Sequence, residues 1–211
     1  MTTSAALEKP IVHVVDDDDS LRKAVTRLLR AAGYDVRAYT SAGDFALAGR
    51  DNNRRGCVLL DVRMPGPSGL DLQEALAKEE EPLPIIFLTA YGDVPTSVRA
   101  MKAGAIDFLT KPIKRDVLLS AVRTALARDL RSHTSRKQLR DLRARFAKLT
   151  PREREVFDLV VTGRLNKQIA AELGMAERTV KAHRGQVMAK MQVTSLAELV
   201  HLADKMQFGV L

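Results

Sequence analysis

The chain has 211 residues, of which 45% are hydrophobic and 28% charged, with a formal net charge of +8 at pH 7. No apolar run approaches the roughly 18 residues that span a bilayer, the first ten residues lack the pattern of a signal peptide, and the one cysteine excludes an internal disulfide. These features exclude integral membrane and disulfide-stabilised secreted proteins, and we expect a cytoplasmic protein of one or two domains.

The positive charge is concentrated in the last third of the chain. Residues 1–128 contain 18 Lys and Arg against 17 Asp and Glu, a net of +1, whereas residues 129–211 contain 16 against 9, a net of +7. A basic excess in the smaller part suggests a module that binds a polyanion. A basic tail that only maintains solubility would have the same charge.

Short apolar segments alternate with segments of helical spacing along the first part of the chain. The predicted strands are residues 11–15, 34–39, 57–60, 85–89 and 106–109, and the predicted helices are residues 20–32, 41–48, 68–78, 94–103 and 114–128. Ser41 is a predicted N-cap, and Gly33 and Gly104 end two of the helices. Five such pairs predict an α/β domain with a parallel, doubly wound sheet and helices on both faces.

Polar residues stand where these strands end. Asp16 and Asp17 follow the first strand, Asp61 ends the third, Thr89 ends the fourth, and Lys111 follows the fifth. Ligands bind at this edge of parallel sheets. Three converging carboxylates need a cation, for which Mg²⁺ is the best candidate, and a nearby lysine and hydroxyl suit a phosphoryl group. Each residue also has an ordinary structural explanation, but their coincidence at four strand ends favours a site.

The segment 128–149 is rich in Lys and Arg and carries a sparse apolar stripe. It could extend the preceding helix, form a separate helix or serve as a flexible basic linker. Ser132–Ser135 contains the weakest helix formers of the segment, so we expect any break in a helix there.

The last part of the chain has the pattern of a helix-turn-helix. Thr150 and Glu153 form a capping box at the start of a helix that ends at Gly163, and Asn166 is a predicted N-cap of the next helix. A longer helix follows over residues 177–191, and a final one opens near Ser195 and runs toward residue 206. The third helix has a basic face, which could be merely solvated but stands on the element that would enter the major groove. The residues of this face are Arg178, Lys181, Arg184 and Lys190.

The motifs VVDDDDS, LLDVRMPGPSG, FLTAYGD and KAGAIDFLTKP, in this order, resemble the receiver domain of two-component response regulators over residues 9–128. The resemblance implies the strand order 2-1-3-4-5 and phosphorylation of Asp61 by a histidine kinase. It also implies that Asp17, Asp61 and the backbone carbonyl of Arg63 hold Mg²⁺, with Asp16 acting largely through water.

By the same resemblance, Thr89 and Lys111 would contact the phosphoryl oxygens, the Lys111–Pro112 bond would be cis, and Thr89 and Phe108 would form the switch. Receivers of this kind are thought to pair through the fourth helix and fifth strand. The residues expected on that face are Val94, Val98, Arg99, Lys102, Ile106 and Asp107.

The segment LTPREREVFDLVVTGRLNKQIAAELGMAERTVKAHRGQVMAKM resembles the LuxR-type DNA-binding domain of the FixJ/NarL family. The residues that this resemblance places on DNA are Asn166, Lys167, Thr179, Lys181, Ala182 and Arg184. Two positions depart from the pattern, because Gly185 replaces a long basic residue of some relatives and Ala176 stands where a serine N-cap is usual. The expected division is a receiver over 9–128, a partly helical linker over 129–146 and a DNA-binding domain over 147–211.

We therefore expect a response regulator, not an enzyme, whose phosphorylation promotes dimerisation and sequence-specific DNA binding, with a histidine kinase, DNA and RNA polymerase as partners. One alternative is a Mg²⁺-dependent phosphohydrolase, which would usually have a second acid where Arg63 stands. Another is a DNA-binding protein whose receiver serves only for dimerisation. The intact set of Asp17, Asp61, Thr89 and Lys111 weighs against the latter.

Overall fold

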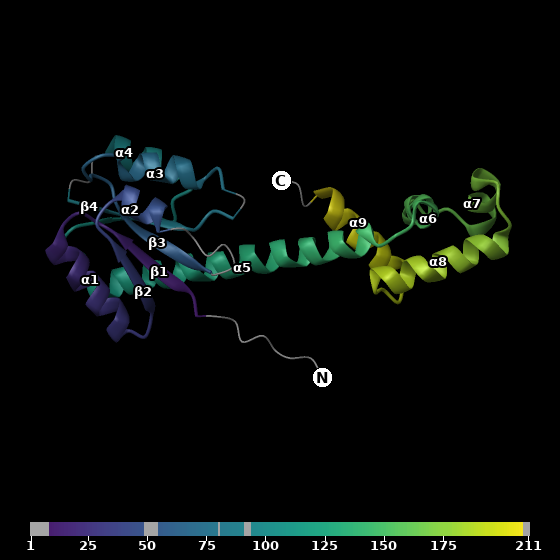
Figure 1. Cartoon of the computed structure of the whole chain (residues 1–211), viewed down its shortest axis with the longest axis horizontal. Coiled ribbons are helices and arrows are strands. Elements are labelled where there is room, and N and C mark those ends of the chain that lie inside the picture. The colour runs from purple at the N-terminus through teal and green to yellow at the C-terminus, as the bar shows by residue number, and fades with distance from the viewer. Residues whose placement is uncertain (1–8, 49–54, 80, 91–93, 209–211) are drawn as a thin grey trace. The chain divides into compact units, whose positions relative to one another are not determined.

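The computed structural model describes residues 9–48, 55–79, 81–90 and 94–208 (Figure 1). The chain divides into two compact units, Met1–His133 and Thr134–Leu211. The amino-terminal segment, which we judged to lack a signal peptide, and residues 91–93 of the FLTAYGD motif lie outside the described residues. No helix within the described ranges is long and apolar enough to cross a membrane.

The first unit is built on a five-stranded parallel sheet with the order β2-β1-β3-β4-β5, which confirms the predicted topology. Its strands are β1 (Ile11–Val15), β2 (Asp35–Tyr39), β3 (Gly56–Asp61), β4 (Ile85–Thr89) and β5 (Asp107–Thr110). The strands β1, β3 and β4 are buried along their whole length, because helices cover both faces of the sheet. This double burial explains why their sequences are continuously apolar.

Helices pack on both faces of the sheet (Figure 1). One face carries α1 (Asp19–Ala31) and the first turns of α5 (Arg115–Ala147), and the other carries α2 (Ala42–Leu47), α3 (Gly69–Leu76) and α4 (Val94–Lys102). The caps follow the predicted chemistry, since Ser41 caps α2 and Gly33, with a φ of 88°, follows α1 in the left-handed region. Each face therefore has its own hydrophobic core.

The start of α3 lies directly against the end of β3. A Cβ atom at Gly69 would lie 2.1 Å from the backbone oxygen of Asp61 and 3.1 Å from the Phe87 ring. Only a glycine lets the helix approach this strand end so closely. Gly69 thus fixes one wall of the region around Asp61.

The helix α5 continues without interruption through Ser132–Ser135, so of the three possibilities for this segment the extension of the preceding helix is the observed one, and no break occurs at its weakest helix formers. Serine, threonine and histidine each cost at most about 0.7 kcal/mol relative to alanine in a helix, which cooperative propagation between good helix formers easily offsets. Within the first unit, the buried side chain of Asp129 accepts a hydrogen bond from the Gly56 amide, with Oδ2 3.1 Å from the nitrogen. This contact joins α5 to the beginning of β3.

The second unit has α6 (Pro151–Val161), α7 (Asn166–Leu173), α8 (Glu177–Met191) and α9 (Leu196–Phe208) around one core. Leu142 and Phe146, from the end of α5, pack into this core. The predicted capping box of Thr150 and Glu153 is present at the start of α6. The order of α6, α7 and α8 matches the predicted helix-turn-helix.

Asn166 is not the N-cap of α7, contrary to our prediction. Leu165 occupies the cap position, and its amide donates to Oε1 of Gln168 at 2.9 Å. The Asn166 side chain instead accepts a hydrogen bond from Arg184 on α8. The amide of Leu165 has no backbone acceptor at the start of the helix, and the Gln168 side chain accepts its hydrogen bond instead. The Asn166 side chain is therefore not needed as a cap and makes a contact between helices.

Candidate functional site

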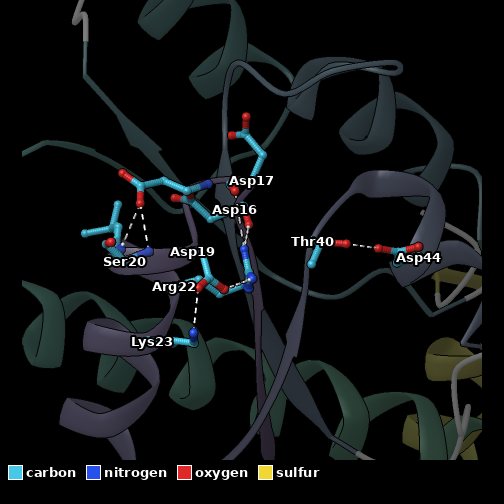
Figure 2. Close-up of polar contacts among 10 residues, drawn as sticks. Asp16, Asp17, Asp19, Ser20, Arg22, Lys23, Thr40 and Asp44 are labelled. Atoms are coloured by element: carbon cyan, nitrogen blue, oxygen red, sulfur yellow. Dashed lines mark hydrogen bonds and ion pairs between the residues drawn. The ribbon is translucent and has the colours of Figure 1, made fainter.

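Carboxylates converge at the carboxyl edge of the sheet, as the strand ends predicted. Asp16 and Asp17 follow β1 and Asp61 ends β3, and each offers an oxygen within 4.8 Å of the others. Asp16 and Asp61 are buried, whereas Asp17 is exposed (Figure 2 shows Asp16 and Asp17). The pocket therefore has two protected carboxylates and one that faces solvent.

Lys111 reaches this pocket from the loop after β5. Its Nζ lies 2.9 Å from Oδ2 of Asp16 and 3.3 Å from Oδ1 of Asp61. The Lys111 amide donates to the Thr89 carbonyl at 2.7 Å, and the Lys111–Pro112 peptide bond is cis, as the resemblance implied. One ammonium group thus bridges the two buried carboxylates.

The electrostatics of the pocket show an excess of negative charge. Burial raises the pKa of Asp61 and the charges of Asp16 and Asp17 raise it further, while Lys111 opposes the shift only in part. Burial alone would lower the pKa of Lys111, but the hydrogen bond to Asp16 and the charges of both carboxylates outweigh it and raise this pKa. A group of hard oxygen donors that one lysine does not neutralise is consistent with a site for a metal cation.

Thr89 lies on β4, the strand beside that of Asp61, and Phe108 lies on β5, the strand beside β4. Thr89 is buried at the end of β4, one residue beyond the register partner of Asp61. Phe108 on β5 is half-buried, and its ring centroid lies 6.1 Å from that of Phe87. Arg63 is exposed, two residues after Asp61.

Two residues next to the pocket, Asp18 and Arg22, were not among the site residues that the sequence predicted. Asp18 caps α1 and accepts hydrogen bonds from the amides of Ser20 and Leu21, at 2.9 and 3.1 Å. Arg22, one turn into α1, donates to the backbone oxygen of Asp16 at 2.8 Å. Arginine is common on exposed helix faces, so its residue type alone does not indicate a contact with the pocket. The only feature of the sequence that could have indicated one is its position shortly after four consecutive aspartates.

In the second unit, the structure divides the predicted DNA-contacting residues into two groups. Lys167, Lys181 and Ala182 are exposed, whereas Asn166, Thr179 and Arg184 are half-buried. The Ala176 cap of α8 makes no side-chain hydrogen bond, as its residue type predicts.

The basic face of α8 is shorter than we predicted. Lys190 donates to both carboxylate oxygens of Glu153, a buried residue of α6, at 2.9 and 2.6 Å. Placing Lys190 on the free basic face was therefore wrong, because the end of α8 packs beside the start of α6 and directs this ammonium inward.

The predicted pairing face on α4 is apolar and exposed in part. The side chains of Val94 and Val98 are exposed, together with Met101, which the sequence prediction omitted although its spacing places it on the same helix face. Arg99 forms an ion pair with Glu74 of α3 at 2.6 Å. The remaining predicted members of this face are Lys102, which is exposed, Ile106, which packs against the core, and Asp107, which accepts from the Phe108 amide.

Comparisons with known families match both units. The family described as response regulator receiver domain matches residues 12–123, and the family of bacterial regulatory proteins, luxR family, matches residues 147–203. Nodulation protein W of Bradyrhizobium diazoefficiens is 47% identical over 199 residues, covering 94% of this chain and 87% of that protein. The response regulator protein TmoT of Ectopseudomonas mendocina is 42% identical over 200 residues, covering 95% of this chain and 90% of that protein.

Solved structures agree with this assignment. The response regulator StyR is 48% identical, with a TM-score of 0.85, and the match covers 93% of this chain and 99% of StyR. Full-length FixJ from B. japonicum is 40% identical, with a TM-score of 0.56, and the match covers 94% of this chain and 98% of FixJ.

The receiver implies a histidine kinase as partner, and the luxR-type helix-turn-helix implies binding to DNA. The family consists of transcription regulators, so the alternative of a phosphohydrolase is set aside. The chain belongs to the two-component response regulators, transcription factors that join a receiver domain with an acidic pocket to a LuxR-type DNA-binding domain.

Proposed function

We propose that Asp61 is the phosphoacceptor and that phosphohistidine of a partner histidine kinase is the donor. A carboxylate oxygen of Asp61 attacks the phosphorus, the P–N bond breaks, and the electron pair of that bond leaves with the imidazole of the kinase. The observation that carries this assignment is the position of Asp61, buried at the end of β3, beside Asp16 and 3.3 Å from the Lys111 ammonium. An acyl phosphate on Asp61 is the product.

We further propose Mg²⁺ as the cation of the acidic pocket. Asp17, Asp61 and the backbone carbonyl of Arg63 would hold it directly, and Asp16 would act largely through water. The convergence of three carboxylates and the raised pKa of Asp61 support this choice, since Mg²⁺ prefers a few carboxylates together with water and phosphate oxygens. When bound, the ion neutralises charge that develops on the transferred phosphoryl group.

Thr89 and Lys111 are proposed to bind the phosphoryl oxygens of phosphorylated Asp61. Lys111 already lies between Asp16 and Asp61, and the hydroxyl of Thr89 is on the adjacent strand. Movement of Thr89 toward the new phosphoryl group would leave space for the half-buried ring of Phe108 to turn inward. The local charge change would thus alter the surface formed by α4 and β5.

This altered surface is proposed to mediate dimerisation. Val94, Val98, Arg99, Lys102, Ile106 and Asp107 are its proposed residues, and the exposed Met101 extends the apolar part. Dimers suit operators whose half-sites lie about one helical turn apart or multiples of it. The dimer would bring two helix-turn-helix units to such an operator and allow contact with RNA polymerase in the cytoplasm.

For DNA binding, we propose that Lys181 and Ala182 lie nearest base edges and that Thr179 and Arg184 also contact DNA. Asn166 and Lys167 would contact phosphate. The exposure of Lys181, Ala182 and Lys167 supports this placement. The proposed division of the chain is receiver 9–128, interdomain segment 129–146 and DNA-binding domain 147–211.

Intact-mass measurement of the full chain after incubation with acetyl phosphate tests the proposal. We expect one added phosphoryl group in the presence of MgCl₂, and none with EDTA or in Asp61→Asn. The same sample should bind operator DNA more tightly than unphosphorylated protein. Phosphate on Asp61→Asn would refute the acceptor, and equal DNA affinity with and without phosphate would favour a receiver that serves only as a scaffold.

A further inference from the structure

Arg22 connects two residues of the loop between β1 and α1, Asp16 and Asp17, with Asp19, the first residue of α1 (Figure 2). Its Nη1 lies 2.8 Å from the backbone oxygen of Asp16 and 3.4 Å from that of Asp17, and its Nη2 lies 2.5 Å from Oδ1 of Asp19. The side chain is only 12% exposed. The guanidinium thus joins the backbone of the acidic pocket to the first turn of α1.

The neighbouring Lys23 provides an internal comparison. It pairs with the other carboxylate oxygen of Asp19 at 2.6 Å, but its side chain is 77% exposed. Both cations therefore share one carboxylate partner, while Arg22 also donates to the carbonyls of the pocket residues. A planar guanidinium can make such fixed, divergent hydrogen bonds, which a single ammonium on a flexible stem reproduces poorly.

The two carbonyls belong to the residues whose carboxylates enter the pocket. The Asp16 side chain is itself held by the Asp18 amide at 2.9 Å and by Lys111 at 2.9 Å. Arg22 completes this set of restraints by fixing the backbone on the side of the loop nearest α1. Groups that orient ligands from outside the coordination sphere commonly change metal affinity by about 10–100-fold when they are removed.

We propose that Arg22 is a positioning residue of the metal site, which holds the Asp16–Asp17 backbone so that both carboxylates are preorganised for Mg²⁺. This inference rests on the proposed Mg²⁺ site. It makes a counterintuitive prediction, because removal of a cation near an acidic pocket should by charge alone strengthen the binding of a divalent cation. Preorganisation predicts the opposite sign.

Calorimetric titration of MgCl₂ into metal-free full-length protein separates the two effects. We compare the unchanged chain with Arg22→Lys, Arg22→Gln and Lys23→Gln. Both Arg22 variants should bind Mg²⁺ at least about tenfold more weakly. Lys23→Gln, which removes an exposed cation with the same Asp19 partner, should stay within about twofold of the unchanged protein.

Two further readouts distinguish positioning from general damage. In EDTA, hydrogen exchange at the Asp18 amide should be faster in the Arg22 variants, while amides of β3 and β4 keep their protection. With acetyl phosphate, the Mg²⁺ concentration that gives half the maximal phosphorylation rate should rise about tenfold. The rate at saturating Mg²⁺ should remain within about twofold of the unchanged protein.

Each other outcome overturns the inference. Tighter Mg²⁺ binding in Arg22→Gln would show that charge, not positioning, governs the site, and undiminished Mg²⁺ binding in Arg22→Lys would show that the fixed hydrogen bonds of the guanidinium are not needed. A rate deficit that saturating Mg²⁺ does not restore would show that the variants are damaged generally. If the unchanged protein binds no Mg²⁺, the proposed metal site fails as well, whereas normal binding by the unchanged chain and all variants removes only the role of Arg22.

Discussion

Arg184 donates a hydrogen bond to the side-chain oxygen of Asn166, with Nη1 3.0 Å from Oδ1. Two residues that we place on DNA, one on α8 and one at the start of α7, therefore hold each other in the free protein. The bond keeps the guanidinium in one orientation, which lowers the conformational entropy that it would lose on binding a phosphate. It also means that Asn166 affects DNA binding through Arg184 as well as directly.

Lys181→Ala and Arg184→Ala should each weaken operator binding and lower the magnitude of the salt dependence. Loss of one phosphate contact reduces the slope of log affinity against log salt concentration by about 1. Fluorescence anisotropy with labelled operator at several salt concentrations measures this slope. Lys190→Met is the matched control from the same helix, because Glu153 holds the Lys190 ammonium, and its slope should be unchanged. An unchanged slope in the Lys181 and Arg184 double variant would refute the placement of α8 on DNA.

Asp61→Asn should stabilise the metal-free receiver at pH 7. The raised pKa of Asp61 means that the folded state holds the proton more tightly than the unfolded chain, so stability falls as pH rises through the interval between the ordinary and raised pKa values. Removing the charge should raise the unfolding midpoint in EDTA by roughly 2–5 °C, the scale that about 1 kcal/mol produces in a domain of this size. Saturating MgCl₂ should narrow this difference. A lower midpoint for Asp61→Asn in EDTA would contradict the electrostatic account.

Glu153→Gln should destabilise the second unit at neutral pH. The hydrogen bond from Lys190 and that from the Thr150 amide lower the pKa of Glu153, so its stabilisation is complete above the ordinary value of 4.5 and is lost as pH falls through the lowered value. At pH 7 we expect the free energy of unfolding to fall by about 1.5–3 kcal/mol, the usual range for hydrogen bonds to charged groups. Hydrogen exchange of α6 amides as a function of pH measures it.

The double variant of Glu153→Gln with Lys190→Met supplies the control. If Glu153 and Lys190 act as a unit, Lys190→Met should lower the free energy of unfolding much less in the Glu153→Gln background than in the unchanged protein. The difference in free energy of unfolding between Glu153→Gln and the unchanged protein should shrink well below pH 4. If it stays undiminished there, the lowered pKa of Glu153 is contradicted.

Val98→Asp should keep the phosphorylated protein monomeric. A charge on the exposed apolar stripe of α4 would face its own copy across a symmetric dimer and oppose association. Sedimentation velocity at micromolar concentration, with and without acetyl phosphate, measures the outcome. Val117→Asp on α5 is the matched control, because its side chain is 46% exposed against 44% for Val98, and it should leave dimerisation intact. Equal dimerisation of both variants would exclude α4 as the pairing face.

The sequence predicted the sheet, its helices and the acidic pocket because these depend on short-range patterns. Continuous apolar runs marked strands buried on both faces, and the aspartates, threonine and lysine stood at predictable strand ends. The contacts of Arg22, Lys190 and Asn166 were not predictable in the same way. Each is a long polar side chain or a helix-terminal residue whose partner depends on how helices and loops pack. Charge patterning placed Lys190 on the basic face, capping preference made Asn166 an N-cap, and Arg22 was not singled out.

The continuity of α5 illustrates the other limit. Local propensity identified Ser132–Ser135 as the weakest part of the segment, but a difference of tenths of a kcal/mol per residue does not determine where a cooperative helix ends. Likewise, Met101 shares a helix face with Val94 and Val98, yet exposure of that face follows only from how α4 packs against α3 and the sheet.

The hydrogen bond between Asp129 and the Gly56 amide has a practical consequence for dissecting the protein. A receiver fragment that stops at residue 128 would lack this acceptor, and a buried amide at the start of the strand that carries Asp61 would lose its partner. Such a fragment would then report the behaviour of a loosened β3. Cutting after residue 133, where the first compact unit ends, keeps Asp129 and gives a fragment whose phosphorylation kinetics can be compared with those of the whole chain.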